Sequence, residues 1–333
     1  MCIRDRTDPF VVDGPRPLRG TIRVPGDKSI SHRVLLLASV AEEPSHLRGL
    51  SDGDDVARTA AAVRHLGSIV RDDGAGGVVV EPGPARSPAA PVDMGNSGTG
   101  LRLLAGLCAG RPVTVELTGD PSLRSRPMAR IADPIRRMGA TVGGPSDGAY
   151  PPLVVTGGGL RGIEYHPPVA SAQVKGAVLL AGLGADGPTT VVEPVPTRAH
   201  TEELLDAMGA DVTVQGPTVT LRPGPLDPLD VTVPGDPSQA AFWVVAALVA
   251  PDSDVTVEDV YLGPAGAGFL EVLERMGAAL LVDRSAGRGR ARTSALRGTR
   301  VEAAEIPGLD EIPVLAVAAA HADGPSRFVD MAE

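Results

Sequence analysis

Residues 137–142, which read RMGATV, end a predicted helix with a glycine and begin a predicted β-strand. Glycine suits this place because the residue after a helix often adopts a left-handed conformation. The same combination occurs four times, and successive glycines lie about seventy residues apart, a constant spacing that indicates an internal repeat. The four turns are residues 65–68 (HLGS), 137–140 (RMGA), 207–210 (AMGA) and 275–278 (RMGA).

A second kind of predicted helix recurs with the same period. These helices are apolar on nearly every side and follow small polar residues, as expected for helices enclosed by the rest of the protein. They alternate with amphipathic helices such as 201–208, so the chain belongs to the α/β class. A generic α/β protein would show similar helices, but not the constant period. The apolar helices are expected at 30–41, 98–109, 173–183, 239–250 and 312–320.

The sequence Val-Pro-Gly-Asp at 24–27 recurs at 233–236, each time before an apolar helix. Three repeats lie between the two copies, so we predict a complete three-repeat domain at 26–233. A second domain would combine 7–25 with 234–333, and its C-terminal part holds less than two repeats. It is therefore either unusually short or truncated. Residues 1–6 (MCIRDR) resemble a translated adapter and are expected to be a non-native prefix.

Composition excludes several classes of protein. The chain has 333 residues, a net charge of −10 and 2% aromatic residues, which argues against binding to nucleic acid. Apolar runs are too short to span a bilayer, and the six histidines lack paired spacing, so we predict neither a membrane protein nor a metal site. Cys2 and Cys108 imply no disulfide framework and favour a cytoplasmic location, with Cys108 in a core helix.

The polar loops before the apolar helices are the expected sites of chemistry. A helix N-terminus presents unpaired N–H groups and a partial positive charge, which suits phosphate and carboxylate groups. Residues 26–33 (GDKSISHR) place Lys28, Ser29 and Arg33 at such a start, either as an anion clamp or as a serine cap with solvated charges. Lys28 and Lys175 are the only lysines in the chain, and arginine does not replace a lysine that acts as a compact charge.

Further motifs allow a functional and a purely structural interpretation. Residues 95–100 (GNSGTG) would bring backbone N–H groups close to a ligand, or form an ordinary capped turn. Residues 171–175 (SAQVK) open another apolar helix, where Lys175 either binds a ligand or extends to solvent. Arg126 and Arg198 suit anion recognition or a surface role. Asp310 and Glu311 would cap the last helix or supply a general base.

From about Leu18 onward, these motifs together resemble the EPSP synthase (3-phosphoshikimate 1-carboxyvinyltransferase) family. The resemblance rests on residues 24–33, 95–100, 119–121 with 126–128, 171–175, 197–201 and 310–311, in order and at the expected spacing. It implies the enolpyruvyl transferase fold, a two-domain inside-out α/β barrel of repeated βαβαββ units, here with the second domain incomplete.

The resemblance also implies a reaction. The enolpyruvyl group of phosphoenolpyruvate moves to the 5-hydroxyl of shikimate 3-phosphate through a tetrahedral intermediate, and phosphate is released, in the shikimate pathway of aromatic amino acid biosynthesis. Neither a metal nor an organic cofactor is implied, and the enzyme is expected to be a monomer. Glyphosate occupies the phosphoenolpyruvate site in this family, and Gly98 is expected to leave room for it.

The resemblance assigns roles to individual residues. Lys28 would contact both substrates, and Asp310 would accept the hydroxyl proton, which makes these two the catalytic residues. Phosphoenolpyruvate would lie against Lys28, Asn96, Gly98, Arg126 and Gln173. Shikimate 3-phosphate would be bound by Lys28, Ser29, Arg33, Ser171, Ala172, Gln173, Arg198 and Asp310.

Three alternatives remain at this point. Family members continue for roughly another hundred residues, which implies that this chain binds shikimate 3-phosphate weakly and turns over poorly, as a binding fragment of the enzyme. UDP-N-acetylglucosamine enolpyruvyltransferase shares the fold, but that family usually has a reactive loop cysteine. A generic α/β scaffold would bind some other anion.

Overall fold

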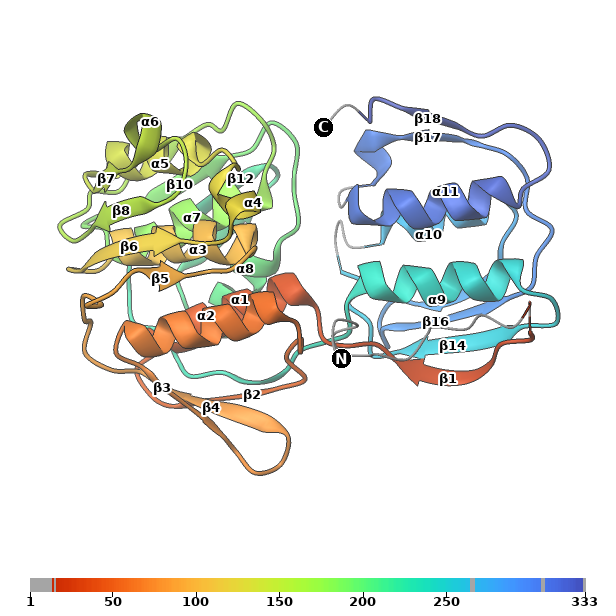
Figure 1. Cartoon of the computed structure of the whole chain (residues 1–333), viewed down its shortest axis with the longest axis horizontal. Helices are drawn as coiled ribbons and strands as arrows, with labels where there is room; N and C mark the ends of the chain where they lie inside the picture. The colour runs from red at the N-terminus through yellow and green to blue at the C-terminus, as the bar shows by residue number, and fades with distance from the viewer. Residues whose placement is uncertain (1–13, 15, 264–266, 307–308, 332–333) are drawn as a thin grey trace. The chain divides into compact units, whose positions relative to one another are not determined.

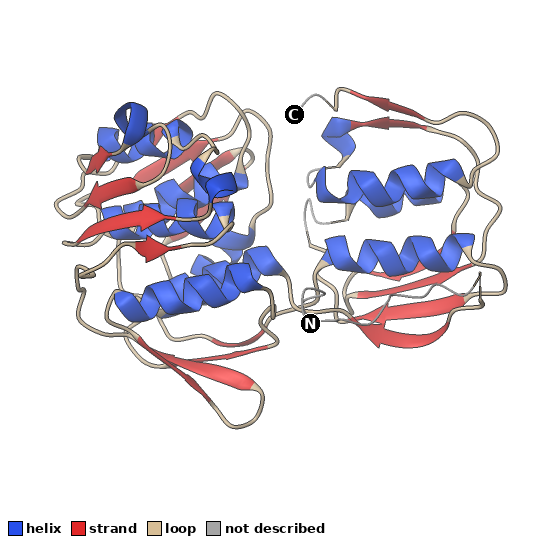
Figure 2. Cartoon of the chain, viewed as in Figure 1, coloured by secondary structure: helices blue, strands red, loops and turns tan. Residues whose placement is uncertain are grey.

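The computed structural model describes residue 14 and residues 16–331, apart from 264–266 and 307–308 (Figure 1). The predicted prefix 1–6 therefore lies outside the described residues. The chain divides into two compact units: unit 2 spans Lys28–Val233, and unit 1 combines the segment up to Asp27 with the segment from Pro234. Each unit is a layered arrangement of strands and helices (Figure 2).

Unit 2 contains three four-stranded sheets with the same topology. In each sheet an edge strand pairs in parallel with its neighbour, and the other pairings are antiparallel. This equivalence confirms that the sequence period reflects repeated folding units. The sheets, each in spatial order, are β13 (Asp230–Thr232), β2 (Ser45–Arg48), β4 (Gly77–Glu81), β3 (Ile69–Asp72); β5 (Val92–Asp93), β6 (Thr114–Thr118), β8 (Leu153–Thr156), β7 (Thr141–Gly143); and β9 (Glu164–Tyr165), β10 (Thr189–Val192), β12 (Thr218–Leu221), β11 (Val212–Gln215).

Three inner helices of unit 2 carry its core. They are α1 (Lys28–Ala38), α3 (Gly98–Ala109) and α7 (Ala172–Gly182), and nearly all of their residues are buried. Apolar residues on every side let these helices be enclosed, as the sequence predicts. The other helices are α2 (Asp54–His65), α4 (Pro121–Arg124), α5 (Ala129–Met138), α6 (Pro145–Gly148) and α8 (His200–Ala207).

The helices α3 and α7 approach each other closely where Gly106 lies against Ala177. A Cβ atom at Gly106 would lie 2.1 Å from the backbone oxygen of Ala177, closer than any real side chain. The absence of a side chain at this position therefore allows the two helices to pack backbone to backbone.

Glycine at the repeated turns has the conformation that the sequence predicts. Gly139 follows α5 with φ of 118° and is the left-handed C-cap of that helix. The glycines of the other three turns also have positive φ. The repeat is therefore encoded at the helix ends as well as in the apolar helices.

Unit 1 contains one four-stranded sheet, one two-stranded sheet and three α-helices among its described residues. Strand β1, from the N-terminal segment, pairs in parallel with β14 and completes the larger sheet. The elements are β1 (Arg19–Arg23), β14 (Asp254–Glu258), β16 (Arg288–Arg292), β15 (Ala279–Asp283), β17 (Arg300–Glu302), β18 (Arg327–Val329), α9 (Pro237–Val249), α10 (Gly268–Arg275) and α11 (Ile312–Ala320), with short 3-10 turns at Ala303–Glu305 and Leu309–Glu311.

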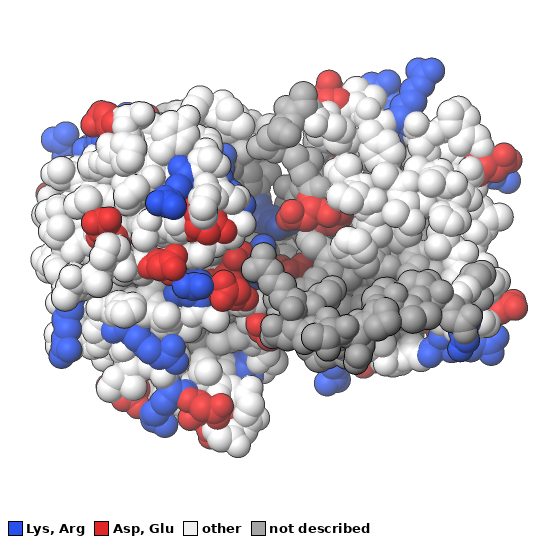
Figure 3. Space-filling model, in the orientation of Figure 1, with Lys and Arg blue, Asp and Glu red and all other residues white. Residues whose placement is uncertain are grey.

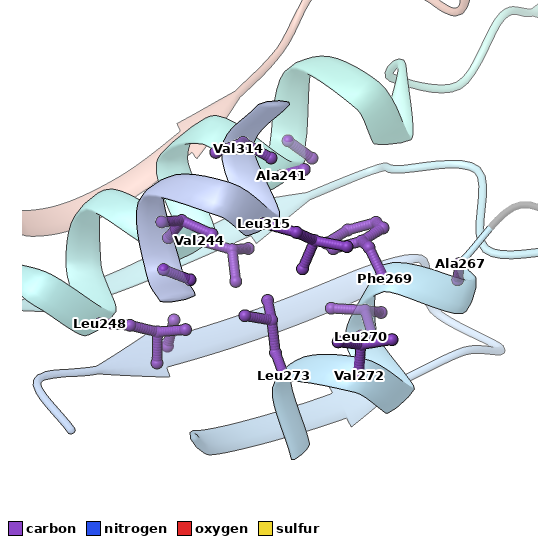
Figure 4. Close-up of a cluster of buried hydrophobic side chains, with 14 of the residues drawn as sticks. Ala241, Val244, Leu248, Ala267, Phe269, Leu270, Val272, Leu273, Val314 and Leu315 are labelled. Carbon is purple, nitrogen blue, oxygen red and sulfur yellow. The ribbon is translucent and has the colours of Figure 1, made fainter. Parts of the chain in front are cut away.

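The core of unit 1 lies between its helices and the larger sheet. Leu315 of α11 points toward Phe269 and Leu273 of α10, while Val244 and Leu248 of α9 complete the cluster (Figure 4). These side chains are at most 3% exposed, so burial of apolar surface within this unit contributes to its stability.

The two Val-Pro-Gly-Asp sequences pair where the chain passes between units. The Asp27 N–H donates to Pro234 O at 2.8 Å, the Asp236 N–H donates to Pro25 O at 2.9 Å, and Gly26 and Gly235 form an antiparallel bridge. This pairing places Gly26 and Asp27 in unit 1, so unit 2 begins two residues after the predicted boundary at Gly26.

Candidate active site

The N-terminal ends of the three inner helices of unit 2 meet through direct hydrogen bonds. Arg33 of α1 donates from Nη2 to Ala172 O at the start of α7, at 3.2 Å. Gln173 of α7 donates from Nε2 to Thr99 Oγ1 of α3, at 3.0 Å. The chain therefore brings three helix N-termini together, an arrangement that favours anions.

Lys28 and Ser29 lie at the start of α1. The Lys28 side chain is 51% exposed, and its Nζ lies 3.5 Å from the Asp55 carboxylate at the start of α2. Ser29 is half-buried, and its backbone oxygen accepts a hydrogen bond of 2.9 Å from Arg33 Nη1. The lysine charge therefore remains within reach of a ligand at this helix end.

The loop before α3 carries the second group of predicted residues. The Ser97 side chain caps the helix by accepting from the Gly100 N–H at 3.1 Å. Arg126 donates from Nη2 to Asn96 Oδ1, so these two predicted residues lie side by side. A Cβ atom at Gly98 would lie 2.9 Å from Arg102 Nη1 and 3.1 Å from Arg126 Nη1, which leaves the space beside both guanidinium groups open.

Arg102 is a buried cation that the sequence analysis did not select. Its Nη1 donates to Gln173 Oε1 at 2.8 Å, and its Nη2 donates to Pro127 O at 3.3 Å. Burial, together with the charges of Arg130 and Arg126, lowers the pKa of Arg102 to about 10. The group remains charged at neutral pH and adds positive potential beside Gln173. The sequence did contain a signal for this residue, because Arg102 is the single charged residue in the apolar helix at 98–109.

Arg33 is 2% exposed and directs three donors to protein oxygens. Besides its bonds to Ser29 and Ala172, its Nε donates to Thr201 Oγ1 of α8 at 2.8 Å. Arg33 thus links α1, α7 and α8 at the predicted site.

Ser171 caps α7, because its Oγ accepts from the Val174 N–H at 3.4 Å. Ser171 therefore has the structural role that the sequence offered as an alternative to ligand binding, that of a helix cap. Its hydroxyl hydrogen can still be donated to a ligand. Ser171, Ala172 and Gln173 are all half-buried, as is Arg198 in the segment before α8. These residues occupy the same end of unit 2.

Asp310 and Glu311, which belong to unit 1, have different environments. Asp310 is exposed, whereas Glu311 is 3% exposed and accepts a hydrogen bond of 2.5 Å from Ser238 Oγ. The Glu311 side chain forms no capping bond with α11. Of the two carboxylates, Asp310 is the one accessible to a reacting group.

Two buried histidines lie among the cations of unit 2. Burial, with the charges of Arg33 and Lys28, lowers the pKa of His32 to about 3. Burial, with the charges of Arg33, Arg198 and Lys175, lowers the pKa of His200 to about 2. Both imidazoles are neutral at physiological pH, so neither serves there as a cationic ligand for phosphate.

Cys108 lies inside α3 and is fully buried, as the sequence predicts. Burial raises the pKa of its thiol to about 12, so the thiolate is scarcely populated at neutral pH. This environment contradicts the reactive loop cysteine expected of the UDP-N-acetylglucosamine enolpyruvyltransferase alternative.

The part of the chain that the structure describes contains neither a candidate metal centre nor a candidate membrane span. There, no group of three or more His, Cys, Asp or Glu side chains has an arrangement that could hold a metal ion. No helix there is both long and apolar enough to cross a membrane.

Comparison with known proteins identifies the family. Residues 12–333 match the family model of EPSP synthase (3-phosphoshikimate 1-carboxyvinyltransferase). The chain belongs to the EPSP synthase family. It is 48% identical over 330 residues to the 3-phosphoshikimate 1-carboxyvinyltransferase of Desulforudis audaxviator, covering 96% of this chain and 77% of that protein. The enzyme of an Anaeromyxobacter species is 49% identical over 325 residues, with coverages of 95% and 76%.

Solved structures of related proteins confirm the predicted fold class. EPSP synthase from Acinetobacter baumannii matches with a TM-score of 0.86 and 40% identity, over 96% of this chain and 76% of that one. The enolpyruvyl transferase NikO from Streptomyces tendae matches with a TM-score of 0.77 and 21% identity, over 95% and 76%. The enolpyruvyl transferase fold of the EPSP synthase family is therefore that of this chain.

Proposed function

We propose that this chain transfers the enolpyruvyl group of phosphoenolpyruvate to the 5-hydroxyl of shikimate 3-phosphate and releases phosphate. Family membership supports the reaction. The observation that carries it at the site is the meeting of three helix N-termini with Lys28, Arg33 and Arg126 at one end of unit 2. Two polyanionic substrates require such a concentration of donors and positive charge.

The positive charge that would bind the substrates comes from groups at the site and not from the protein as a whole. The net charge of the chain is −10, and basic and acidic side chains are interspersed over the face of unit 2 that is visible in Figure 3. A mixed surface exerts little long-range attraction on an anion, so the helix ends and the nearby arginines supply the binding energy.

Within this proposal, the predicted substrate residues keep their roles. Shikimate 3-phosphate binds Lys28, Ser29, Arg33, Ser171, Ala172, Gln173, Arg198 and Asp310, and phosphoenolpyruvate binds Lys28, Asn96, Gly98, Arg126 and Gln173. Hydrogen bonds among several of these residues support the assignment, because one ligand can reach both α1 and α7. A new bond joins the 5-oxygen to C2 of the enolpyruvyl group, and the bond between C2 and the phosphate oxygen breaks.

Asp310 is proposed to take the proton from the 5-hydroxyl. Its exposed carboxylate supports this role, whereas the buried Glu311 is engaged by Ser238. A general base of this kind typically contributes about 10²- to 10⁴-fold to the rate. Asp310→Asn is expected to reduce phosphate release by that factor, and to weaken the binding of shikimate 3-phosphate by no more than about 10-fold, the usual net effect of one altered hydrogen bond.

Calorimetric titration with shikimate 3-phosphate tests the proposed function, and phosphate release with both substrates reports the transfer itself. Arg126→Gln is expected to weaken the binding of phosphoenolpyruvate, or of glyphosate, to the chain saturated with shikimate 3-phosphate. Arg124→Gln is the matched control, because Arg124 is exposed two residues earlier. Failure of the unaltered chain to bind shikimate 3-phosphate would contradict the proposal.

The protein is further proposed to act as a monomer in the cytoplasm, without nucleic acid or membrane partners. The low aromatic content and the negative net charge support the absence of nucleic acid. The use of only two cysteines, of which Cys108 is a free thiol, supports a reducing compartment. Sedimentation velocity tests the oligomeric state, and a dimer mass would contradict it.

A further inference from the structure

Lys175 lies in the first turn of α7. One interpretation of the sequence had its side chain extend to solvent, but the structure shows it buried. Its side chain is 2% exposed, and Nζ lies 2.8 Å from Glu193 Oε2 and 2.6 Å from Glu202 Oε1. Both carboxylates are also buried, at 2% and 5% exposure. A compact ammonium therefore joins three elements of unit 2: the helix α7, the end of β10 and the helix α8.

The Glu193 carboxylate has a second partner in the segment that follows it. Thr197 donates its hydroxyl to Glu193 Oε1 at 2.5 Å and its backbone N–H to Glu193 Oε2 at 3.3 Å. The segment 194–199 contains neither helix nor strand. Its conformation near Thr197 is thus set by a buried carboxylate that Lys175 holds against α7.

Arg198 is the residue next to this anchor. Its charge acts on His200 of α8, because burial and the charges of Arg33, Arg198 and Lys175 together lower the pKa of that histidine. On the other side of Arg198, helix α8 begins at His200, and Thr201 accepts from Arg33 Nε. The backbone that carries Arg198 is therefore held at Thr197 and again at the start of α8.

We propose that Glu193, fixed by Lys175, is a positioning residue that places Arg198 through Thr197 for the phosphate group of shikimate 3-phosphate. The inference rests on the proposed function and extends it to three residues outside the predicted site. When an arginine binds a phosphate, both its side chain and the loop that carries it lose conformational freedom, which weakens binding. A loop that is already anchored in the free protein loses less freedom on binding.

The identity of the anchoring cation follows from the geometry. Nζ of Lys175 lies between two carboxylates on different elements, in a space that is closed to solvent. A planar guanidinium is larger and presents its donors in a fixed fork, so it does not substitute for a point charge there. This accounts for one of the two lysines that persist in an arginine-rich chain.

Thr197→Val tests the inference with little change in shape. Titration with shikimate 3-phosphate should show affinity weaker by about 3- to 10-fold, the net effect of one ordinary hydrogen bond, because the substitution acts on the ligand only through the position of Arg198. Thr190→Val is the matched control, because Thr190 lies in β10 and its hydroxyl bonds to Thr220 at 3.0 Å, away from Arg198. Its affinity should stay within about 2-fold of the unaltered chain, below the effect of a hydrogen bond to a charge.

A double-mutant cycle separates positioning from a general loss of structure. Arg198→Ala alone should weaken binding by about 10- to 100-fold, and adding Thr197→Val should then change the affinity by less than about 2-fold. Additive effects of the two substitutions, or an unchanged affinity in Thr197→Val, would overturn the inference.

Hydrogen exchange provides a readout that does not depend on the ligand. Amides of residues 194–199 should exchange faster in Thr197→Val than in Thr190→Val. Unchanged exchange would show that Glu193 does not anchor the segment. If exchange accelerates but the unaltered chain binds no shikimate 3-phosphate, the proposed function fails and the role in substrate binding fails with it, while the anchor itself stands.

Discussion

Arg102 and Gln173 are joined by a hydrogen bond of 2.8 Å between Nη1 and Oε1, although they are 71 residues apart in the sequence. Because Arg102 has only donors, it fixes which end of the Gln173 amide is the oxygen. The amide nitrogen is correspondingly directed to Thr99 Oγ1. The orientation of a proposed substrate residue is thus determined by a buried arginine on another helix.

Replacement of Arg102 by Met should release the Gln173 amide. We expect the affinity for glyphosate in the presence of shikimate 3-phosphate to fall by about 10-fold, since one charged hydrogen bond and a nearby positive charge are lost. Arg130→Met is the control, because Arg130 is exposed. Fluorescence or calorimetric titration measures the change, and equal effects of the two substitutions would show that only general electrostatics is involved.

Gly98→Ala should reduce the binding of phosphoenolpyruvate selectively. The new methyl group would lie 2.9 Å from Arg102 Nη1 and 3.1 Å from Arg126 Nη1, so both guanidinium groups would have to move. We expect about 10-fold weaker binding of phosphoenolpyruvate, the equivalent of one lost charged hydrogen bond.

For this substitution the affinity for shikimate 3-phosphate serves as the internal reference and should change by less than about 2-fold. Gly187→Ala is the matched control, since a Cβ atom there has no heavy atom within 4 Å. Loss of both ligands together would indicate a distorted helix start and contradict the prediction.

Protonation of His32 should destabilise the folded protein in acid. The folded pKa is about 3 and the ordinary value is 6.5, so the unfolded chain binds a proton that the folded chain excludes between these values. Above about pH 6.5 His32 is neutral in both states and the free energy of unfolding has its full value. As the pH falls below 6.5, His32 lowers the free energy of unfolding, by about 1.4 kcal/mol per pH unit well below that value.

His32→Asn isolates this contribution, because its amide retains a hydrogen bond to Thr59, which lies 2.8 Å from Nδ1 of the histidine. Urea unfolding at pH 7.5, 6.5 and 5.5 measures the difference in unfolding free energy between variant and unaltered chain. That difference should shift in favour of the variant as the pH falls. A difference that is independent of pH would show that His32 titrates normally in the folded state.

Gly106→Ala should separate the helices α3 and α7. Its Cβ atom would lie 2.1 Å from a backbone oxygen of Ala177, which no side-chain rotation relieves. We expect a loss of about 2–3 kcal/mol in unfolding free energy, typical of overpacking. Gly143→Ala is the control, since nothing lies within 4 Å of its Cβ position. Similar melting temperatures for the two variants would refute the close-packing argument.

Local rules allowed much of the fold to be predicted from the sequence. Gly139 ends α5 in the left-handed conformation that its place after a helix requires, and the apolar helix at 98–109 is found at those residues. The domain limit differs by two residues from the expected one, because the pairing of Gly26 with Gly235 joins residues that are far apart in the sequence. Amphipathic and capping patterns involve residues within one or two helical turns and can therefore be recognised in the sequence. The bridge between Gly26 and Gly235 joins distant residues and has no such local pattern.

The sequence by itself determined the repeat, the apolar helices and the polar residues that begin each of them, because these depend on periodicity and capping between near neighbours. Only the tertiary structure decided that Gln173 is oriented by Arg102, and that Lys175 turns inward to Glu193 and Glu202. A hydrogen bond or buried ion pair needs distances that the folded chain sets, so residue type alone did not distinguish a lysine in solvent from one that anchors the site.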